Sequence, residues 1–505
     1  MSHKTKEQLA AEAAALWNGL KGKSAAGSLS PKERLAIPAQ EMPARDPVKR
    51  AREMDEVALG YSEAQARVEA ERCLGCKNQP CVAACPVNVP IRDFIARVQK
   101  GEFKGAVDTI KRTNLLPAIC GRVCPQEKQC QSACTVGKSL GTVDKAVAIG
   151  RLERFVADWE RENGLVTAPA VAGETGKRVA VIGSGPAGLT VAADVRREGH
   201  AVTVFEAFHK TGGVMVYGIP EFRLPKEIVA KETEALKEMG VEFRTNFLVG
   251  RTGTVDQLLE SEGFDAAFIG TGAGLPKFMD IPGENLIGVF SANEYLTRAN
   301  LMRAYDRTRA DTPMYEAKTV AVVGGGNVAM DAARMALRLG AEKVYCVYRR
   351  TREEMPARAE EIEHAGEEGV EFRFLRNPTR ILGDENGRVR AIELLEFELG
   401  ESDASGRRSP VAKEGTEHEI PVDAVIVALG NESNPLMKQT TEGLDVTKRG
   451  NIVVDGNQKT SLKKVWAGGD IVLGAATVIL AMGEGRKAAA SINAYLAGED
   501  DLKAD

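Results

Sequence analysis

The chain has 505 residues, which predicts about three to four domains at roughly 150 residues per domain. Its 43% hydrophobic and 27% charged residues exclude wholesale disorder, and no run reaches the roughly 18 apolar residues that span a bilayer. A net charge of −4 with only 5% aromatic residues argues against a groove for nucleic acid. Because the first residues favour an amphipathic helix over a signal peptide, we expect a cytoplasmic enzyme.

Eight of the nine cysteines lie in two groups between Cys73 and Cys134. The first group follows the spacing C-x2-C-x4-C-x3-C-P and comprises Cys73, Cys76, Cys81 and Cys85. The second group follows C-x3-C-x5-C-x3-C and comprises Cys120, Cys124, Cys130 and Cys134. Helical apolar spacing at residues 91–100 and 143–158 predicts that these groups belong to an all-α domain. The ninth cysteine, Cys346, is expected to be a buried, unreactive thiol.

The spacing favours iron–sulfur clusters over the two other uses of grouped thiols. Disulfides are disfavoured because nothing indicates secretion and cytosolic thiols stay reduced. Zinc would suit paired C-x2-C units, but the spacings are uneven and a proline follows Cys85. In two-cluster ferredoxins three closely spaced thiolates bind one cluster, while the Cys-Pro thiolate binds the other. We therefore predict that Cys73, Cys76 and Cys81 hold one cluster and that Cys85 reaches a second. The spacing leaves open how the second group divides.

A dinucleotide-binding fingerprint begins shortly after the cysteines. Residues 178–182 form a predicted buried strand, followed by a glycine turn, a helix through Arg197 and a strand over 201–205 that ends on Glu206. The turn lets a pyrophosphate approach the helix N-terminus, and Glu206 is placed to accept hydrogen bonds from an adenosine ribose. The glycines of the turn are Gly183, Gly185 and Gly188.

The same unit recurs later in the chain, which indicates a duplicated fold and two bound dinucleotides. A strand over 319–323 leads through a second glycine turn into a helix ending near Leu339, and a strand follows over 343–348. Where the first unit ends in an acid, this one ends in Arg349 and Arg350, a pair suited to the 2′-phosphate of NADPH. The turn residues of this unit are Gly324, Gly326 and Asn327.

Further glycine-rich segments predict a flavin site. Gly213 lies in a glycine-rich stretch over residues 212–220, and Gly469 and Asp470 follow a predicted strand near the C-terminus. Asp470 is placed to bond a ribityl hydroxyl, and the helix that begins near Thr477 directs its positive N-terminal end toward a reduced flavin. Two further strands are typical of crossing points between nucleotide domains, at residues 265–269 and 423–429.

Taken together, the motifs resemble a known family. The cysteine groups occur with GSGPAG, YGIPEFRLP, GGGNVAMDA, YRRTREEMPA and AGGDIVLGAATVILAMGEGRKAA. This combination is similar to the small (β) subunit of NADPH glutamate synthase, the large subunit of NADH-dependent ferredoxin:NADP oxidoreductase and the N-terminal half of dihydropyrimidine dehydrogenase. The resemblance covers roughly residues 45–497, and within it residues 37–61 are most similar to the ferredoxin:NADP oxidoreductase branch and to short glutamate synthase-like proteins.

The resemblance implies a multidomain fold: an all-α iron–sulfur domain followed by an α/β flavoprotein with two Rossmann-like dinucleotide-binding domains, as in disulfide reductases. The expected divisions are an N-terminal extension at 1–45, a helical domain with two 4Fe-4S clusters at 46–170, an FAD domain at 177–295 and 425–505, and an inserted NADPH domain at 296–424. One implied cluster binds Cys73, Cys76, Cys81 and Cys134. The other binds Cys85, Cys124, Cys130 and Glu153, which leaves Cys120 unused.

The implied function is an NAD(P)H-dependent oxidoreductase that contains FAD and 4Fe-4S clusters. Hydride passes between NADPH and FAD, and single electrons pass through the clusters to a partner subunit, as in the glutamate synthase small subunit; no residue is assigned as a general base. A first alternative is the large subunit of an electron-bifurcating ferredoxin:NADP oxidoreductase, with a ferredoxin:NAD flavoprotein as partner, and a pyrimidine-reducing complex is another. A different class, a non-catalytic electron relay or scaffold, is disfavoured by the intact glycine turn and the paired arginines.

Overall fold

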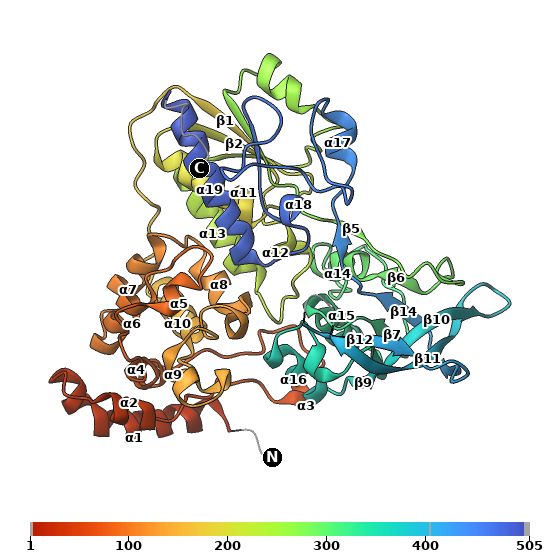
Figure 1. Cartoon of the computed structure of the whole chain (residues 1–505), viewed down its shortest axis with the longest axis horizontal. Coiled ribbons are helices and arrows are strands. Elements are labelled where there is room, and N and C mark those ends of the chain that lie inside the picture. The colour runs from red at the N-terminus through yellow and green to blue at the C-terminus, as the bar shows by residue number, and fades with distance from the viewer. Residues whose placement is uncertain (1–3, 403–405, 499–505) are drawn as a thin grey trace.

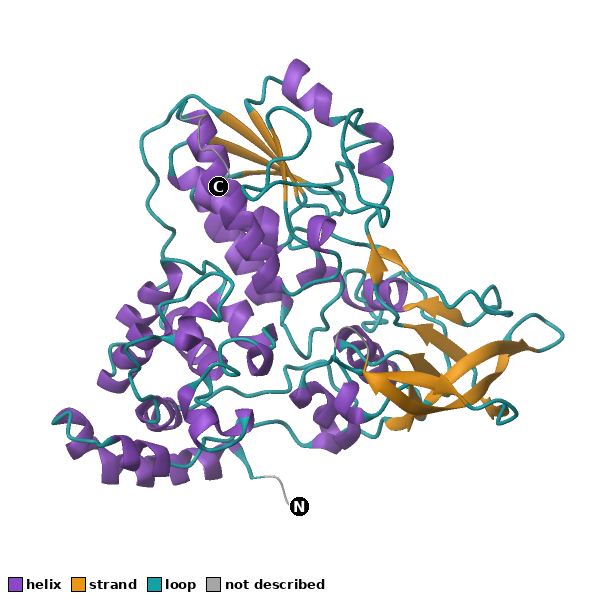
Figure 2. Ribbon diagram, in the orientation of Figure 1, coloured by secondary structure: helices purple, strands orange, loops and turns teal. Residues whose placement is uncertain are grey.

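The computed structural model describes residues 4–402 and 406–498, and these residues form three domains (Figure 1). A helical domain comes first in the chain, and a first α/β domain follows it. A second α/β domain is inserted into the first, so that the chain leaves the first sheet and later returns to it. Figure 2 shows the strands gathered in these two α/β domains. Among the described residues, no helix is long and apolar enough to cross a membrane.

Short helices with caps encoded in the sequence make up the helical domain. At the start of α4, for example, Ser62 accepts a hydrogen bond from the backbone N–H of Gln65, whose side chain bonds back to Ser62. Apolar faces that carry Phe94, Ile110 and Leu152 meet in the core. The helices are α1 (Lys6–Ala25), α2 (Pro31–Ala36), α3 (Pro47–Arg50), α4 (Glu63–Glu71), α5 (Pro80–Ala83), α6 (Ile91–Lys100), α7 (Phe103–Lys111), α8 (Pro117–Val123), α9 (Thr135–Ser139) and α10 (Ile149–Glu162).

The N-terminal extension packs against the helical domain, and the boundary expected at residue 45 stays a prediction. The amphipathic helix predicted there is α1, and it packs along α4. The guanidinium of Arg67 on α4 lies 4.4 Å from the centre of the Trp17 ring, and Arg34 on α2 forms an ion pair of 2.7 Å with the buried Glu71. These contacts bury the outer face of α4.

The helix predicted over residues 143–158 is interrupted. A single 3-10 turn, η2, spans Val143–Lys145, and α10 begins only at Ile149. The buried guanidinium of Arg72 donates to the carbonyls of Lys145 and Ala146, and the carboxylate of Glu69 accepts from the N–H of Ala148 at 2.8 Å. These side chains bind backbone groups that a continuous helix would need for its own hydrogen bonds.

The first α/β domain contains one parallel sheet in the order β16-β4-β1-β2-β3. The predicted strand, helix and strand of the first fingerprint are confirmed as β1, α11 and β2. The strands are β1 (Arg178–Ile182), β2 (Ala201–Phe205), β3 (Glu242–Arg244), β4 (Ala266–Ile269) and β16 (Val465–Ala467). The helices are α11 (Pro186–Arg197), α12 (Val214–Tyr217), α13 (Lys226–Glu238), α17 (Leu436–Thr440), α18 (Asp470–Leu473) and α19 (Val478–Leu496), with one π-helical turn at Gln257–Ser261.

The second α/β domain repeats this plan with a parallel sheet in the order β6-β14-β7-β8-β9 and adds an antiparallel sheet of β10 to β13. The second predicted unit is confirmed as β7, α15 and β8. The strands are β6 (Val289–Ser291), β7 (Thr319–Val323), β8 (Lys343–Tyr348), β9 (Glu371–Phe374), β10 (Arg376–Gly383), β11 (Val389–Ser402), β12 (Arg408–Ala412), β13 (His418–Pro421) and β14 (Ala424–Val427). The helices are α14 (Ala292–Asn300), α15 (Asn327–Arg338) and α16 (Ala359–Glu367).

The inserted domain is longer than the expected 296–424. Val289 and Phe290 of β6 pair with Val425 and Ile426 of β14, so both strands belong to the second sheet and not to the first domain. The chain passes between the domains at a short two-stranded ribbon of β5 (Leu275–Pro276) and β15 (Asn431–Glu432). This ribbon follows the two strands predicted as crossing points. The boundaries move because a parallel sheet takes its strands from both ends of an insertion.

A segment that we call the strap, residues 45–58, joins the domains. Its Arg52 donates to the carbonyls of Leu337 and Ala341 in the second α/β domain. The N–H of Val57 donates to the carbonyl of Phe222, which belongs to a loop of the first α/β domain. The strap therefore contacts both α/β domains as well as the helical domain.

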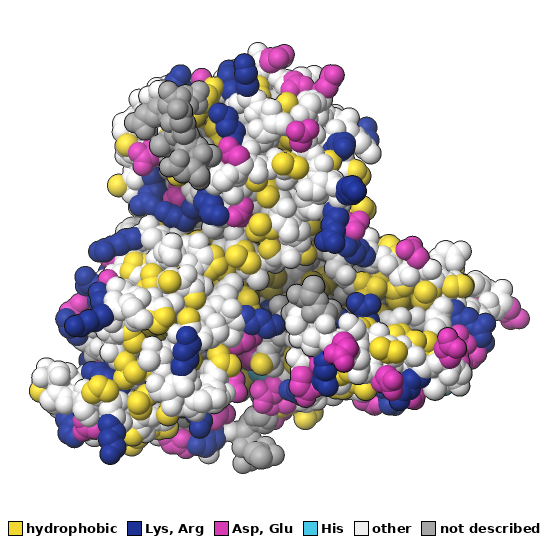
Figure 3. Space-filling view, in the orientation of Figure 1, with side chains coloured by type: hydrophobic (Ala, Val, Ile, Leu, Met, Phe, Trp, Pro, Cys, Tyr) yellow, Lys and Arg dark blue, Asp and Glu magenta, His cyan; other side chains and the backbone are white. Residues whose placement is uncertain are grey.

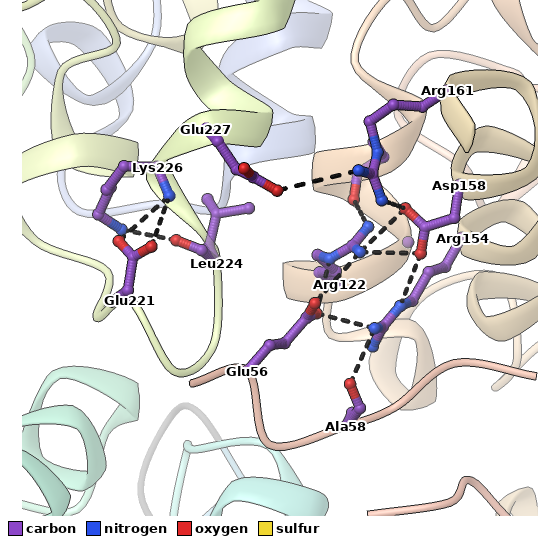
Figure 4. A network of polar contacts seen from close by, with 12 residues as sticks. Glu56, Ala58, Arg122, Arg154, Asp158, Arg161, Glu221, Leu224, Lys226 and Glu227 are labelled. Carbon is purple, nitrogen blue, oxygen red and sulfur yellow. Dashed lines mark hydrogen bonds and ion pairs between the residues drawn. The ribbon is translucent and has the colours of Figure 1, made fainter. Parts of the chain in front are cut away.

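Figure 4 shows the strap's contact with the helical domain. The carboxylate of Glu56 forms ion pairs of 2.7 Å with Arg122 on α8 and 2.9 Å with Arg154 on α10. Asp158 lies beside them and pairs with the same two arginines. Arg154 also donates to the carbonyl of Ala58 at 2.8 Å. The end of the strap is thereby fixed between two helices of the cysteine-bearing domain.

The carboxylate of Glu368, which follows α16, is the centre of a buried ionic network between the strap and the second α/β domain. It forms ion pairs of 3.0 Å with Arg50 of the strap and of 2.7 Å with both Arg334 and Arg338 of α15. Arg50, Arg334 and Glu368 have almost no exposed surface. Burial alone would raise the pKa of Glu368. The charges and hydrogen bonds of Arg334 and Arg338 lower it by more than that, so the pKa lies well below the usual range of a glutamate.

A loop of the first α/β domain joins this network from the other side. The ring of Phe222 lies 3.8 Å from the guanidinium of Arg338, and Arg223 binds both oxygens of Asp331 on α15 at 2.7 Å. Arg223 also forms an ion pair with Glu361 on α16. The second α/β domain is therefore fixed to both of its neighbours by desolvated charges, an arrangement in which removal of one partner is costly.

We expect the variant Glu368→Gln to lower the free energy of unfolding by about 3–5 kcal/mol, because it leaves buried arginine charges without their carboxylate. Thermal unfolding and limited proteolysis of the full chain measure the loss. The matched control is Glu371→Gln, which removes a half-exposed partner of Lys343 and should leave both measurements nearly unchanged. An equal effect of the two variants would contradict the role of the network.

The network also predicts sensitivity to acid. Because the pKa of Glu368 is lowered in the folded state, its stabilisation is complete above the ordinary glutamate pKa of about 4.3 and is lost as the pH falls below that value. The difference in melting temperature between the native chain and Glu368→Gln should therefore shrink when the pH is lowered from about 6 toward about 3. A difference that stays constant over this range would show that the carboxylate charge is not responsible.

Candidate functional site

The first glycine turn has the shape that a pyrophosphate requires. Gly183 has a φ of +100°, and a Cβ there would lie 2.5 Å from the carbonyl oxygen of Gly270. A Cβ on Gly188 would lie 1.9 Å from the carbonyl oxygen of Gly183, so α11 packs on β1 through a residue without a side chain. Beside Gly185 no atom lies within 4 Å of the Cβ position. The open side of the turn therefore faces the N-terminus of α11, where backbone N–H groups favour a phosphate.

Glu206 lies directly against this turn. Its side chain is buried, with 5% of its surface exposed, and its carboxylate accepts hydrogen bonds from the N–H groups of Ser184 at 3.0 Å and Phe208 at 2.9 Å. The Ser184 hydroxyl also donates to Glu206 and accepts from the N–H of Gly212. A Cβ on Gly213 would lie 2.8 Å from the Cα of Gly185. The structure thus brings the predicted acid, the turn and the glycine-rich stretch together.

The C-terminal segment completes the same cradle. A Cβ on Gly469 would lie 3.0 Å from the Cβ of Ala187, which is the second residue of α11. Asp470 begins α18, and burial raises its pKa to about 6, while the N–H of Ala476 donates to its carboxylate. Thr477 caps α19, and its hydroxyl accepts from the N–H of Leu480. Three segments that are distant in the sequence therefore meet at the N-terminal ends of α11 and α19.

In the second α/β domain the glycine turn has the same geometry. Gly324 has a φ of +145°, and its Cβ would lie 2.4 Å from the carbonyl oxygen of Ala428. A Cβ on Gly325 would lie 2.6 Å from the ring of Tyr348, whereas the nearest atom to a Cβ on Gly326 is 4.0 Å away. Asn327 begins α15, and its side-chain oxygen accepts from the N–H of Arg358 at 2.9 Å. The open side of the turn again faces a helix N-terminus.

The two arginines after β8 differ in exposure. Arg349 is exposed, but Arg350 has only 5% of its surface exposed, and its Nε donates to the carbonyl of Arg408 on β12 at 2.6 Å. Consecutive residues at the end of a strand point to opposite faces, so the two side chains separate. The two side chains lie in different surroundings, and the binding of one ligand by both guanidiniums stays a prediction.

Cys73, Cys76, Cys81 and Cys134 line one cavity of the helical domain. The other walls are largely apolar and include Ile91, Ile95 and Ile149. Burial raises the pKa of Cys73 to about 11 and that of Cys81 to about 12. Cys134 lies with the first three cysteines around this cavity, which is the grouping that the resemblance implies; the division of the thiols between clusters stays a prediction.

A second group of side chains lies close by. Burial raises the pKa of Cys130, and the charges of Cys124, Cys85, Glu153 and Cys81 raise it further, so Cys130 lies near Cys81 as well as near the other three groups. Glu153 has 8% of its surface exposed; burial raises its pKa to about 8, while the amide of Asn114 donates to one carboxylate oxygen at 2.7 Å. This is the set that the resemblance implies for a second cluster.

Cys120 also lies beside this group, where a hydrogen bond with Cys124, burial and the charge of Glu153 raise the pKa of its thiol. Its sulfur is 3.7 Å from the side-chain oxygen of Asn114 and 3.7 Å from the sulfur of Met482 on α19. Around a four-iron cluster each ligand binds a different iron, so the ligands surround a volume instead of meeting at one point. Among the described residues, no three ligand side chains meet at one point as they would around a single ion. Thiols around an apolar cavity fit a cluster of this kind.

Helix α19 connects the cradle with the loop after Cys85. Near its N-terminus a Cβ on Gly485 would lie 2.6 Å from the carbonyl oxygen of Ala187 on α11, and a Cβ on Gly483 would lie 3.0 Å from that of Pro86. Pro86 directly follows Cys85 in the chain. The helical domain and the first glycine turn are thus pressed against the same two turns of α19. The surface is hollowed at its centre, where the three domains meet (Figure 3).

Three buried polar residues at these sites escaped sequence reasoning: Asn114, Gln126 and Arg358. Asn114 bonds Glu153, and the other two form a contact between the second glycine turn and the cysteine loop. Arg358 is adjacent to the YRRTREEMPA motif, which is the only sequence signal near it. Nothing in local spacing marks the other two, because their partners come from distant segments.

Comparisons with known proteins support the same division of the chain. Residues 50–165 match the family of dihydropyrimidine dehydrogenase domain II with a 4Fe-4S cluster, and residues 177–485 match the pyridine nucleotide-disulphide oxidoreductase family. Among solved structures, FprA from Mycobacterium tuberculosis in complex with NADPH is similar in fold, with a TM-score of 0.53 and 22% identity over 64% of this chain and 86% of that one.

Close relatives are known across the whole length. The glutamate synthase (NADPH) small chain of Escherichia coli is 38% identical to this chain. The match covers 90% of this chain and 96% of that protein. The corresponding protein of Azospirillum brasilense is 37% identical, and the match covers 90% of this chain and 95% of that protein. The β subunit of the NADP-dependent formate dehydrogenase of Moorella thermoacetica is 40% identical but is covered only to 60% of its length. The resemblance inferred from the motifs is confirmed: the chain belongs to the glutamate synthase small-chain family, in which a 4Fe-4S domain precedes a pyridine nucleotide oxidoreductase domain.

Proposed function

We propose that this chain takes hydride from NADPH onto FAD and passes the electrons singly, through two 4Fe-4S clusters, to a partner subunit. The observation that carries the proposal is the packing of α19, which touches both the first glycine turn and the loop after Cys85. FAD, when bound, accepts two electrons together and releases them one at a time, whereas an iron–sulfur cluster accepts only one. Such a reaction needs the two sites side by side, and the close packing of α19 against both segments supports this.

The cradle around α11 is the proposed FAD site. Gly185 leaves room for the pyrophosphate, and Glu206 is placed for the adenosine ribose. Asp470 and the N-terminus of α19, capped by Thr477, orient the flavin end and direct positive potential toward it. The full proposed set is Gly183, Gly185, Gly188, Glu206, Gly213, Gly469, Asp470 and Thr477.

The second glycine turn is the proposed NADPH site, formed by Gly324, Gly326 and Asn327. Its exposed Arg349 is placed to bind the 2′-phosphate, whose charge distinguishes NADPH from NADH. Arg350, whose Nε donates to the carbonyl of Arg408, is the second residue of the proposed pair. No general base is assigned, because the chain contributes binding, orientation and electrostatics to the hydride transfer.

The helical domain is proposed to hold two clusters. Cys73, Cys76, Cys81 and Cys134 are the ligands of one, and their common cavity supports this assignment. Cys85, Cys124, Cys130 and Glu153 are the ligands of the other, supported by their mutual electrostatic interaction. Asn114 orients Glu153 through its amide. A carboxylate ligand in place of a thiolate is expected to alter the potential of that cluster.

The proposed partner is a large glutamate synthase subunit, and the place of action is the cytoplasm. The glutamate synthase small chains support this choice because they match this chain over nearly their entire length. The formate dehydrogenase β subunit, by contrast, extends well beyond the matched part. The acceptor is tested by supplying the chain, together with its native partner, with NADPH, glutamine and 2-oxoglutarate. Formation of glutamate supports the proposal. When NADPH is supplied instead with NAD and ferredoxin, NAD-dependent reduction of ferredoxin supports the bifurcating alternative.

Under anaerobic conditions NADPH should bleach the flavin absorbance of the isolated chain. The variant Arg349→Met should raise the KM for NADPH about 10- to 100-fold, because a charged hydrogen bond contributes about 1.5–3 kcal/mol. The reaction with NADH should stay unchanged. Lys343→Met, at the opposite end of β8, is the matched control with the same loss of charge. If both nucleotides are affected equally, or if NADPH leaves the flavin oxidised, the proposed site is wrong.

Single substitutions separate the cluster ligands. Cys124→Ser should remove about half of the bound iron, because one of two clusters is lost. Cys120→Ser, the matched control on the preceding turn of α8, should retain all of the iron. Glu153→Cys should retain the iron but change the electron paramagnetic resonance spectrum of the reduced protein. Loss of iron in Cys120→Ser, together with an unchanged spectrum in Glu153→Cys, would assign the ligand to Cys120 instead.

A further inference from the structure

Arg358 lies between the second glycine turn and the helical domain. It is buried, with 8% of its surface exposed, and its backbone N–H donates to the side chain of Asn327 at 2.9 Å. The N–H of the preceding residue, Ala357, donates to the carbonyl of Gly325 at 3.2 Å. The backbone of this segment is thus hydrogen-bonded to two residues of the turn. A change in the turn is transmitted directly to Arg358.

The guanidinium of Arg358 crosses into the cysteine-bearing domain. One terminal nitrogen donates to the carbonyl of Arg122 at 2.6 Å, and the other donates to the side-chain oxygen of Gln126 at 3.0 Å. Two carboxylates lie on its outer side, Glu360 at 3.2 Å and Glu127 at 3.8 Å. One arginine side chain therefore spans the boundary between the proposed nucleotide site and the helical domain.

Gln126 continues this connection to the proposed ligands of the second cluster. Its N–H donates to the carbonyl of Cys124 at 2.9 Å, and its side-chain amide donates to the carbonyl of Cys120 at 3.3 Å. A Cβ on Gly150 would lie 2.1 Å from that amide nitrogen, so α10, which carries Glu153, is packed against it. The side chain of Gln126 is therefore held on every side, and a displacement of Arg358 reaches the loop of Cys124.

We propose that Arg358 is a positioning residue that couples nucleotide binding at the second glycine turn to the reduction of the cluster held by the Cys124 loop. The inference rests on the proposed function, because it takes both sites as assigned there. Reduction adds a negative charge on the side of the guanidinium, and NADP adds its pyrophosphate at the turn to which the backbone of Arg358 is bonded. Each anion draws the same cation, so each weakens the other's binding.

This coupling has a direction and a use. NADP lowers the potential of the cluster, and by thermodynamic reciprocity a reduced cluster lowers the affinity for NADP by the same factor. The oxidised nucleotide is therefore released more readily once its electrons have moved on to the cluster. The release precedes transfer to the partner and leaves the turn open for the next NADPH.

The test uses 2′-phospho-ADP-ribose, which carries the pyrophosphate and the 2′-phosphate but no nicotinamide and is inert to reduction. Its dissociation constant is measured by titration calorimetry with the full chain, first oxidised and then reduced by dithionite. We expect reduction to weaken binding at least about 5-fold in the native chain, the low end of usual allosteric couplings. In Arg358→Met the ratio of the dissociation constants in the reduced and oxidised states should fall to within 2-fold of unity. Arg358→Lys, which keeps the charge, should recover part of the native ratio.

Two further variants separate coupling from simple loss of structure. Gln126→Met keeps the backbone of Arg358 on the turn but removes its side-chain link, and should lose the ratio as Arg358→Met does. Lys128→Met is the matched control, because Lys128 crosses the same boundary to the carbonyl of Pro356 without contacting Gln126, and should keep the native ratio. The midpoint potential of the cluster, followed by electron paramagnetic resonance with and without the probe, should change by the equivalent amount.

A native chain that binds the probe equally in both redox states, or an Arg358→Met variant that keeps the native ratio, overturns the proposal. Iron content and binding of the probe are measured first in the oxidised native chain, and the resonance signal is measured after reduction by dithionite. If they are absent, the proposed function itself fails, which distinguishes that outcome from a failure of the coupling alone.

Discussion

The buried ion pairs of Glu368 with Arg50, Arg334 and Arg338 are the constraint on which the arrangement of the domains depends. The carboxylate and its arginines are desolvated, so each requires the others in place. Because Arg50 belongs to the strap, the network fixes the second α/β domain to a segment that also reaches the helical domain. Arg223 adds a fixed contact from the first α/β domain. A protein that carries electrons between separate centres needs these distances to stay constant.

The second α/β domain is consequently held from three directions, by the strap, by the loop around Phe222 and by Arg358. Here the helical domain adds a third surface, and the inserted domain contacts it through Lys128, Arg151 and Arg358. The geometry supports hydride transfer between fixed sites instead of transfer that waits for rotation of a domain.

Two glycines of α19 permit its close contacts with other segments. Gly483 and Gly485 permit the backbone of the Cys85 loop and of α11 to approach the helix, and a side chain at either position would separate them. The distance between a proposed flavin site and a proposed cluster is set by these two positions. Single hydrogen bonds then refine each site, as Asn114 does for Glu153.

Much of this protein is determined locally by its sequence. Strands over 178–182, 201–205, 319–323 and 343–348, and the helices between them, lie where apolar periodicity and glycine turns predict them, because those signals act within a few residues. The family resemblance, and not the spacing, predicted that Cys134 lies beside Cys73, because a loop of many residues can close in several ways.

Tertiary structure alone decided the rest. The Nε of Arg350 donates to the carbonyl of Arg408. The helix expected at residue 143 is interrupted where the guanidinium of Arg72 binds the backbone. The inserted domain takes strands of its sheet from both ends of the insertion. In each case a partner from a distant segment satisfies a buried charge or a backbone group. Local patterns do not specify such partners, because the free energy of burying a charge or a backbone group depends on what lies beside it in space.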